Sequence, residues 1–188
     1  MAGRATIDLE LGPEHSGLRV GVPPMDGDLA QRVFQLRSCS AADFGFAWSL
    51  YENLMKTLTV ELIGRWNEPG QKRVVEQALT QEGTSIIIID GSDVGWLHVA
   101  ESSDAIYLGQ LYLAPDLQNR GIGTAIVTEL RDKARTAGKA LTLDVMKNNR
   151  ARFFYERLGF QVIGQSEHKL KMRWQENEHE NEHGSESQ

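Results

Sequence analysis

The sequence predicts an α/β (α+β) domain in which a central mixed, mostly antiparallel sheet is flanked by helices. Three observations lead to this fold class. Two stretches with apolar residues at helical spacing come first, three strand-like runs joined by short turns follow, and helices then alternate with strands to about residue 174. With 188 residues, 40% of them apolar, the chain is long enough for one domain with a sizeable core.

The predicted domain spans residues 33–174. Residues 1–32 carry glycine or proline in every stretch that could form an element, so we expect an irregular N-terminal extension there. A short strand begins within VFQLRS, and Ser40 then caps a helix whose apolar positions recur every three or four residues. A second helix is expected to follow Asn67.

The middle of the chain favours an antiparallel meander. The runs TSIIIID, DVGWLHVAE and AIYLGQLYL each have the composition of a strand. An Asp-Gly pair at 90–91 separates the first two, and Ser-Ser-Asp at 102–104 separates the second and third. Connections this short indicate hairpins.

The last third alternates helix and strand. A helix is predicted over residues 121–137 and ends at Gly138, which suits the left-handed position that closes many helices. The strand LTLDVM, a helix over 151–158 and a strand from Phe160 follow. This alternation is typical of α/β folds.

Charge and composition exclude several classes of partner. Residues 175–188 contain five Glu and no Lys or Arg, and are expected to form a disordered acidic tail. Without this tail the chain has 20 basic and 21 acidic residues, so no nucleic-acid partner is expected. The longest aliphatic run has four residues, far short of the roughly 20 that span a bilayer, so no membrane partner is expected.

Cysteine and histidine usage bears on location and metals. Cys39 has no partner in the chain, which favours a reducing, cytoplasmic location and a small core residue over a nucleophile. The N-terminus shows no apolar segment of the kind found in a secretory signal. His179 and His183 could bind a metal only weakly, so no metal is expected.

Gly121 and Gly123 stand in the first turn of a predicted helix, where each costs about 1 kcal/mol relative to alanine. The N-terminus of a helix carries unpaired N–H groups and a partial positive charge, and glycine lets a bulky anion approach the backbone. A ligand can compensate for the cost of the glycines. The pair therefore predicts a phosphate-binding turn.

Three phosphate-binding patterns compete for this turn. A Walker A loop is excluded because Gly123 is followed by Thr124 and no lysine. The dinucleotide fingerprint finds Ile126 where its third glycine belongs, and seven residues separate Gly121 from the strand before it. The pattern Q/R-x-x-G-x-G/A matches in full, at Gln118, Gly121 and Gly123.

These residues resemble the glycine turn of the GNAT superfamily of acyl-CoA-dependent N-acyltransferases. A second motif of that family, N-x-x-A-x-x-x-Y followed by Gly-Phe, matches about 30 residues downstream, at Asn148, Ala151, Tyr155, Gly159 and Phe160. The order of elements over residues 35–174 also agrees. The resemblance implies the GNAT fold, N-acetyltransferase activity, and acetyl-CoA as co-substrate without a metal.

The resemblance also implies how coenzyme A is held. The pyrophosphate would lie on the N–H groups of the glycine turn, and the pantetheine arm would run beside the preceding strand. The residues implied in cofactor binding are Leu111, Tyr112, Leu113, Gln118, Asn119, Arg120, Gly121, Ile122, Gly123, Thr124 and Asn148. Residues 120–157 carry nine basic and four acidic side chains, a balance that suits a polyanion.

Tyr155 is the catalytic residue that the resemblance implies. Direct attack of an amine on the thioester would release a thiolate, and Tyr155 occupies the position of the acid that protonates it. Many relatives carry a glutamate on the strand before the glycine turn, but AIYLGQLYL has no carboxylate and Gln110 cannot act as a base. The base stays open between a water chain and the side chains Glu52, Glu101, Asp104 and His98.

The substrate side of the site is less defined. Glu52 and Gln110 are the residues assigned to it, and the first two helices with their link are expected to select the acceptor. The aromatic residues Trp48, Tyr51, Trp66 and Trp96 could line its pocket or belong to the core. A small amine, an amino acid, a polyamine and a protein terminus would each fit.

Two further questions stay open at this point. A homodimer is possible, because many members of the family that the chain resembles are dimers. The alternative to an enzyme is a non-catalytic acyl-CoA-binding sensor on the same fold, for which the missing strand carboxylate would be the reason.

Overall fold

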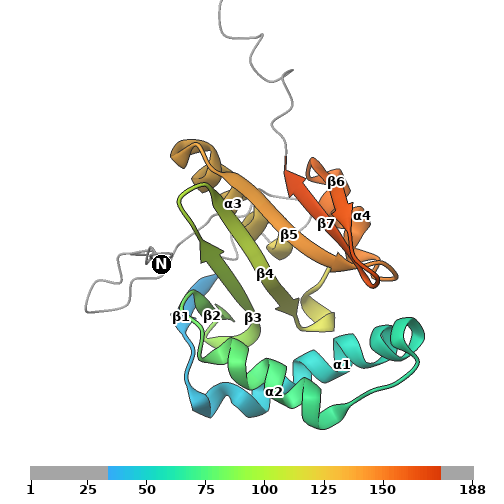
Figure 1. Ribbon diagram of the computed structural model, residues 1–188. Coiled ribbons are helices and arrows are strands. Elements are labelled where there is room, and N and C mark those ends of the chain that lie inside the picture. Colours follow the sequence, from blue (N-terminus) through green and yellow to red (C-terminus); the bar gives the residue numbers. More distant parts are fainter. Residues whose placement is uncertain (1–33, 175–188) are drawn as a thin grey trace, which may run out of the picture.

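The computed structural model describes residues 34–174 and places seven strands in one sheet (Figure 1). The order across the sheet is β1-β2-β3-β4-β5-β7-β6, and every neighbouring pair is antiparallel except β4 and β5. The strands are β1 Gln35–Ser38, β2 Thr84–Ile89, β3 Ser92–Glu101, β4 Ala105–Leu113, β5 Ala140–Met146, β6 Phe160–Gln165 and β7 Lys169–Trp174. The predicted extension and acidic tail lie outside the described residues.

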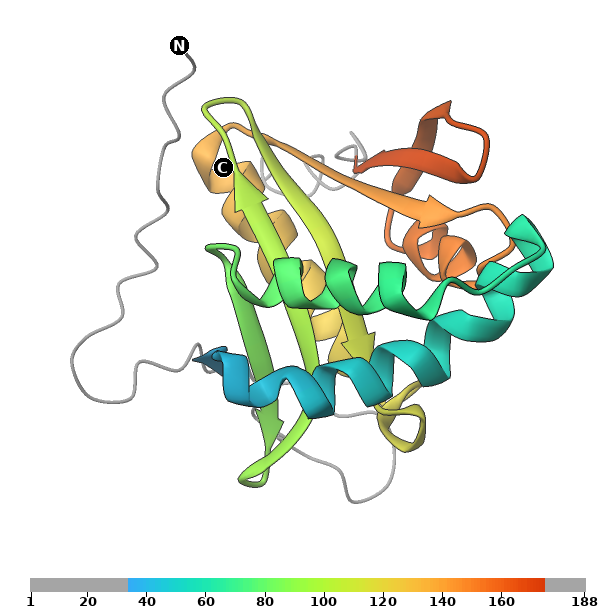
Figure 2. The same cartoon turned by 60° about the horizontal axis from the view of Figure 1, so that its bottom comes forward.

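Helices cover both faces of the sheet, as Figure 2 shows. The pair α1 and α2 crosses one face, and α3 and α4 cover the other. Their bounds are α1 Phe44–Ile63, α2 Glu68–Leu79, α3 Ile122–Ala137 and α4 Ala151–Arg157, with short 3₁₀ turns η1 Ala41–Asp43 and η2 Pro115–Leu117. Within residues 34–174, no helix is long and apolar enough to cross a membrane. The predicted fold class is confirmed.

Local sequence explains where these elements begin and end. Asn67 caps α2 by accepting a hydrogen bond from the Gly70 N–H at 3.3 Å. Asp90 and Gly91, at φ 51° and 77°, form the left-handed turn that joins β2 to β3. Gly138 closes α3 at φ 64°. The turns and the helix end predicted at these positions are confirmed.

One strand differs from the sequence prediction. The sequence predicts a single strand from Phe160, whereas the structure has a hairpin in which β7 lies between β5 and β6. The hairpin turns where the Ser166 N–H bonds the Lys169 carbonyl at 2.8 Å, within a polar segment that has no glycine or proline. Met172 and Trp174 are the buried positions of β7.

The core lies in two layers because side chains alternate across each strand. On β3, Trp96 packs toward α1 and α2, whereas Leu97 packs toward α3. On β5, Leu143 and Val145 belong to the cluster beneath α3 and α4. The side chain between them, Asp144, therefore faces the α1 and α2 side.

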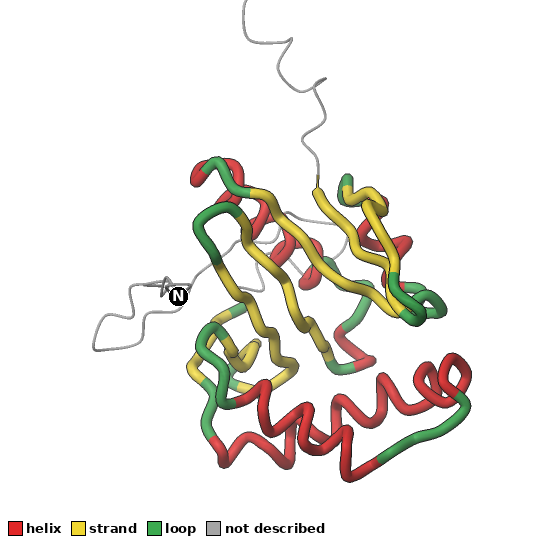
Figure 3. Tube along the Cα trace, viewed as in Figure 1, coloured by secondary structure: helices red, strands yellow, loops and turns green. Residues whose placement is uncertain are grey.

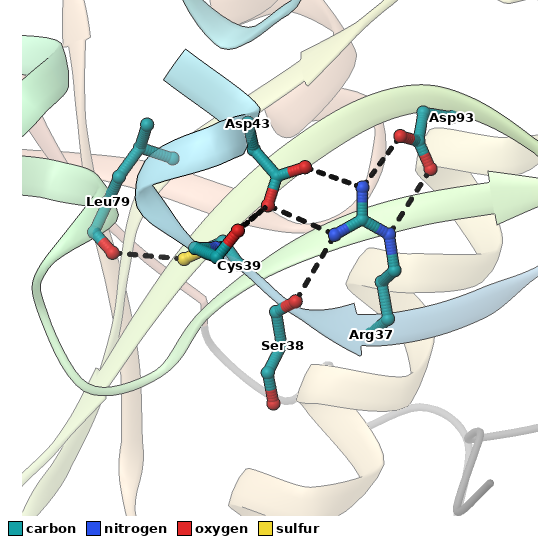
Figure 4. Close-up of polar contacts among 7 residues, drawn as sticks. Arg37, Ser38, Cys39, Asp43, Leu79 and Asp93 are labelled. Carbon is teal, nitrogen blue, oxygen red and sulfur yellow. Dashed lines mark hydrogen bonds and ion pairs between the residues drawn. The ribbon is translucent and has the colours of Figure 1, made fainter.

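A charged clamp, formed by Arg37, Asp43 and Asp93, joins β1 to η1 and to β3 (Figure 4). The guanidinium of Arg37 on β1 bonds Asp43 at 2.7 Å and Asp93 at 2.6 Å. This pairing lowers the pKa of Asp43 to about 2. Beside the clamp, the Cys39 thiol donates to the Leu79 carbonyl at 3.0 Å, and burial raises its pKa, so the predicted structural role of Cys39 fits its surroundings.

Candidate active site

A cavity opens where β4 and β5 separate. The parallel ladder runs from Ala105 paired with Ala140 to Leu108 paired with Leu143, and ends there. Beyond that point the two strands diverge, as Figures 1 and 3 show. A cavity of about 340 Å³ lies in the opening, lined by residues 108–112 of β4, 144–146 of β5 and parts of α1, α2 and α4.

A bulge on β4 marks the start of the opening. Across β3, His98 pairs with Gln110 and Val99 with Leu108, so Gly109 is an extra residue in β4. A Cβ on Gly109 would lie 2.6 Å from the His98 Nδ1, so a side chain at this position would require His98 to move. The bulge changes the direction of β4 next to the last residue pair that it shares with β5.

At its end, β4 has backbone groups that no strand among residues 34–174 pairs on the side away from β3. The Ala114 N–H bonds the Val94 carbonyl at 2.8 Å, which fixes the hydrogen-bonded pairs of β3 and β4 at alternate residues. Tyr112 accordingly bonds β3, whereas the N–H and C=O of Leu111 and Leu113 point away from it. They point toward the side from which β5 has diverged, a strand-like surface for an extended ligand.

The glycine turn lies directly after this strand end. Asn119 and Gly121 take left-handed conformations, at φ 60° and 82°, and Gly121 caps α3. Ile122 is buried and anchors the first turn, in which N–H groups have no intrahelical partner. The Gln118 amide donates to the Leu113 carbonyl at 2.9 Å and holds the turn against β4.

Other predicted cofactor residues surround this turn. Arg120 and Thr124 are exposed, so neither is committed to the core. Gly123 faces the ring of Phe154 on α4, 3.3 Å from where a Cβ would be. The helix α4 therefore borders the turn as well as the cavity.

Tyr155 of α4 lines the cavity. Its side chain is 9% exposed, between Phe154 at 5.0 Å and Phe160 at 5.6 Å between ring centroids. Burial raises the pKa of Tyr155 to about 12, so its hydroxyl keeps its proton at neutral pH. Phe153, by contrast, is 50% exposed, because successive side chains of a helix point about 100° apart and three in a row cannot all face inward.

Asp144 is the carboxylate that the sequence reasoning missed. It follows the last parallel pair of β5, lines the cavity, and accepts a hydrogen bond from the Tyr107 hydroxyl at 3.0 Å. Burial and the charge of Asp144 raise the pKa of Tyr107 to about 12, so this hydroxyl remains a donor. The two side chains lie on the sheet face covered by α1 and α2, and Tyr155 lies on the other. The signal that would have identified Asp144 is the register of the parallel strands β4 and β5, which the sequence does not show.

Gln110 and Tyr51 also line the cavity, on the α1 and α2 side. The Gln110 Oε1 is buried without a hydrogen-bond partner among residues 34–174. The Tyr51 hydroxyl donates to the Gln71 Oε1 at 2.5 Å. Because a buried acceptor without a donor costs about 1–3 kcal/mol, Gln110 is available for a ligand N–H.

The base candidates from the sequence lie elsewhere. Glu52 forms an ion pair with Lys56 at 3.0 Å and does not border the cavity. Glu101 pairs with Lys133 and Lys139, which together lower its pKa despite its burial.

Asp104 stands in the turn between β3 and β4, bonded by the Ser102 hydroxyl at 2.8 Å. His98 is buried behind the bulge, and burial lowers its pKa. Neither side chain lines the cavity. Of the carboxylates in residues 34–174, only Asp144 does so.

Asn148 and Asn149, which precede α4, have side chains with different hydrogen-bond partners. Asn149 lines the cavity, and its side chain accepts a hydrogen bond from the Ala151 N–H, the first of α4, at 2.9 Å. Asn148 instead donates to the Leu58 carbonyl of α1 at 2.9 Å, and its own Oδ1 is buried without a partner in the described part of the chain. Asn148 thus joins the α4 loop to α1.

The four aromatic residues of the sequence analysis form one cluster with Tyr112. Their ring centroids lie 4.9–6.2 Å apart. Tyr51 lines the cavity, Trp96 is 1% exposed in the core, and Trp48 and Trp66 pack behind Tyr51. Of the two alternatives, a pocket lining holds for Tyr51 and core packing for the three tryptophans.

The fold and the site together define an acyltransferase of the GNAT class. A diverging pair of parallel strands leads from a glycine turn to a cavity with a buried tyrosine. Residues 48–160, more than half of the chain, match the acetyltransferase (GNAT) family. The chain belongs to this family, which confirms the predicted superfamily and class of enzyme. In residues 34–174, no group of three or more His, Cys, Asp or Glu side chains could hold a metal.

A curated relative agrees with this membership. An uncharacterized N-acetyltransferase of Methanocaldococcus jannaschii is 29% identical over 90 residues. The match covers 43% of this chain and 40% of that protein, so the chain spans less than half the length of this relative.

Solved structures share the fold at low sequence identity. The PaiA N-acetyltransferase of Thermoplasma acidophilum in complex with coenzyme A is 18% identical, with a TM-score of 0.57 over 76% of this chain and 99% of that one. The ribosomal-protein-S18-alanine N-acetyltransferase of Escherichia coli is also 18% identical, with a TM-score of 0.55 over 78% and 97%. These likenesses establish the fold alone.

Proposed function

We propose that the protein transfers the acetyl group of acetyl-CoA to a primary amine by direct attack in the β4–β5 cavity. The observation that carries the proposal is the cavity between β4 and β5, with Asp144 on one side and Tyr155 on the other, lined by the strand that leads into the glycine turn. Family membership supports acyl transfer over the non-catalytic sensor.

The residues present fit coenzyme A as a substrate. The glycine turn and the N-terminus of α3 would hold its pyrophosphate through backbone N–H groups. The N–H and C=O of Leu111 and the N–H of Leu113 would hold the pantetheine amides as a neighbouring strand does, while the Leu113 carbonyl stays bonded to Gln118. The thioester would then lie in the cavity that Tyr155 lines.

The reaction forms one C–N bond and breaks one C–S bond. The neutral amine attacks the thioester carbonyl, the nitrogen of the tetrahedral intermediate loses a proton to solvent, and the intermediate collapses so that the sulfur leaves with the electron pair of the C–S bond. The Tyr155 hydroxyl, protonated because burial raises its pKa to about 12, gives its proton to the departing thiolate. Tyr155 then recovers a proton from solvent.

Asp144 provides the negative charge on the acceptor side. An alkyl amine with a pKa of about 10.4 arrives as an ammonium ion, and freeing its electron pair at pH 7 costs roughly 4–5 kcal/mol. Asp144, oriented by the Tyr107 hydroxyl, attracts the ammonium ion and passes its proton toward solvent. The Gln110 Oε1 can accept a second amine N–H, which keeps the nucleophile oriented.

Thiol release from acetyl-CoA with an added amine tests the proposal. We expect Asp144→Asn to lower kcat/KM for the amine about a hundredfold, within the range for a lost acid–base group. Asp132→Asn, an exposed carboxylate on α3, is the matched control and should retain full activity. If Glu52→Gln removed the activity and Asp144→Asn left it intact, the assignment of Asp144 would be wrong.

A further inference from the structure

The cavity presents an unusual balance of charge to an acceptor. Asp144 is its one carboxylate among residues 34–174, and the basic side chains that line it are Lys169 and His168. Lys169 is exposed and His168 is half-buried, and they stand where the β6–β7 turn meets β7. The remaining polar lining is neutral. One ammonium group of an acceptor can therefore pair with Asp144, whereas a second ammonium group would approach the positive charge of Lys169.

The opening of the same cavity is apolar. Met55, Thr59 and Ile63 follow one another at four-residue spacing on α1 and line the cavity together with Val74 of α2. Ile63 and Val74 are 44% and 43% exposed, although both are large aliphatic residues. Exposed apolar side chains beside a cavity gain from contact with an apolar ligand.

We infer that the acceptor is a monoamine: a single ammonium group that pairs with Asp144, attached to an apolar body that lies along Met55, Ile63 and Val74. This inference rests on the proposed function and narrows it. Polyamines are disfavoured because a second ammonium group inside the cavity would approach the ammonium of Lys169, whereas the carboxylate of Glu167, 3.7 Å from His168, is 86% exposed and does not line the cavity.

A pair of amines separates the two classes. With saturating acetyl-CoA, kcat/KM is measured by thiol release for 2-phenylethylamine and for spermidine. We expect the monoamine to exceed spermidine at least tenfold. Lys169→Glu should raise the ratio of kcat/KM for spermidine to kcat/KM for 2-phenylethylamine several-fold, because only spermidine carries a second charge to that position.

The apolar opening is tested separately. Ile63→Ser should raise KM for 2-phenylethylamine about fivefold and leave kcat nearly unchanged, as expected for binding energy used equally in ground and transition states. Val162→Ser is the matched control, since Val162 is 47% exposed on β6 and does not line the cavity. Equal effects of the two variants would overturn the placement of the apolar body.

The outcomes distinguish the inference from the proposal beneath it. Turnover of both amines with spermidine preferred would overturn the monoamine assignment and leave acetyl transfer standing. Absence of turnover with every amine tested, while coenzyme A still binds, would overturn the proposed function and the inference with it.

Discussion

Replacement of Gly123 by glutamate tests the phosphate-binding turn without weakening the fold. In the first turn of a helix, glutamate gains about 0.5–1 kcal/mol over glycine in propensity, and its charge gains about 0.3–1 kcal/mol near the N-terminus. The new Cβ would lie 3.3 Å from the Phe154 ring, which must yield by a few tenths of an ångström. We therefore expect a folded variant at least about as stable as the parent protein.

The same change should cost coenzyme A affinity. A carboxylate placed about 5 Å from the pyrophosphate repels each of its unit charges by about 1–2 kcal/mol at an effective dielectric constant of about 40–80. For two charges the penalty is about 2–3 kcal/mol, a roughly 30- to 150-fold rise in Kd. The effect should shrink as salt is added, because salt screens exposed charges.

Calorimetric titration with coenzyme A measures this loss, and thermal unfolding confirms that the variant is folded. Gly123→Ala is the matched control, because it places the same Cβ beside Phe154 without the charge, and should change Kd only a few-fold. A folded Gly123→Glu protein that binds coenzyme A within threefold of the parent would refute the location of the pyrophosphate. Equal losses in both variants would assign the effect to Phe154 contact and not to charge.

Two other contacts give predictions of their own. Asp43→Asn should cost about 2 kcal/mol at pH 7, and the difference should vanish as the pH falls from about 4 to 2, because the folded pKa of about 2 lies below the ordinary value of 3.8. Urea unfolding at several pH values measures this difference in the free energy of unfolding, and a difference that stays constant with pH would contradict the ion-pair explanation. Asp93→Asn should cost under about 1 kcal/mol, because the ion pair of Asp93 with Arg37 is partly exposed. Gln118→Ala releases the Leu113 carbonyl and should weaken coenzyme A binding a few-fold at unchanged kcat, whereas an unchanged Kd would show that the turn needs no tether.

Local pattern predicted the parts of the site that local chemistry determines. The glycine turn could be located because Gly121 needs a left-handed conformation that other residues adopt only with strain. Tyr155 could be placed because the motif N-x-x-A-x-x-x-Y, which resembles that of the GNAT family, is a local pattern along the chain. The hairpin at Asp90 and Gly91 is likewise a property of two adjacent residues.

Features that depend on pairing between distant segments could not be predicted in this way. Asp144 faces the cavity because β5 runs parallel to β4 and separates from it after Leu143, a register that no local stretch determines. Glu52 was a candidate for the general base in the sequence, but its carboxylate forms an ion pair with Lys56, one helical turn away. The strand β7 was missed because its place between β5 and β6 is a matter of tertiary pairing.

The most direct measurement of the central claim is the yield of N-acetylated product per coenzyme A released, by mass spectrometry, with 2-phenylethylamine as acceptor. The account predicts one acetylated amine for each free thiol, and a rate about a hundredfold lower in Tyr155→Phe at an unchanged Kd for coenzyme A. Thiol release without acetylated amine, or equal rates in Tyr155→Phe and the parent, would contradict direct transfer in the β4–β5 cavity.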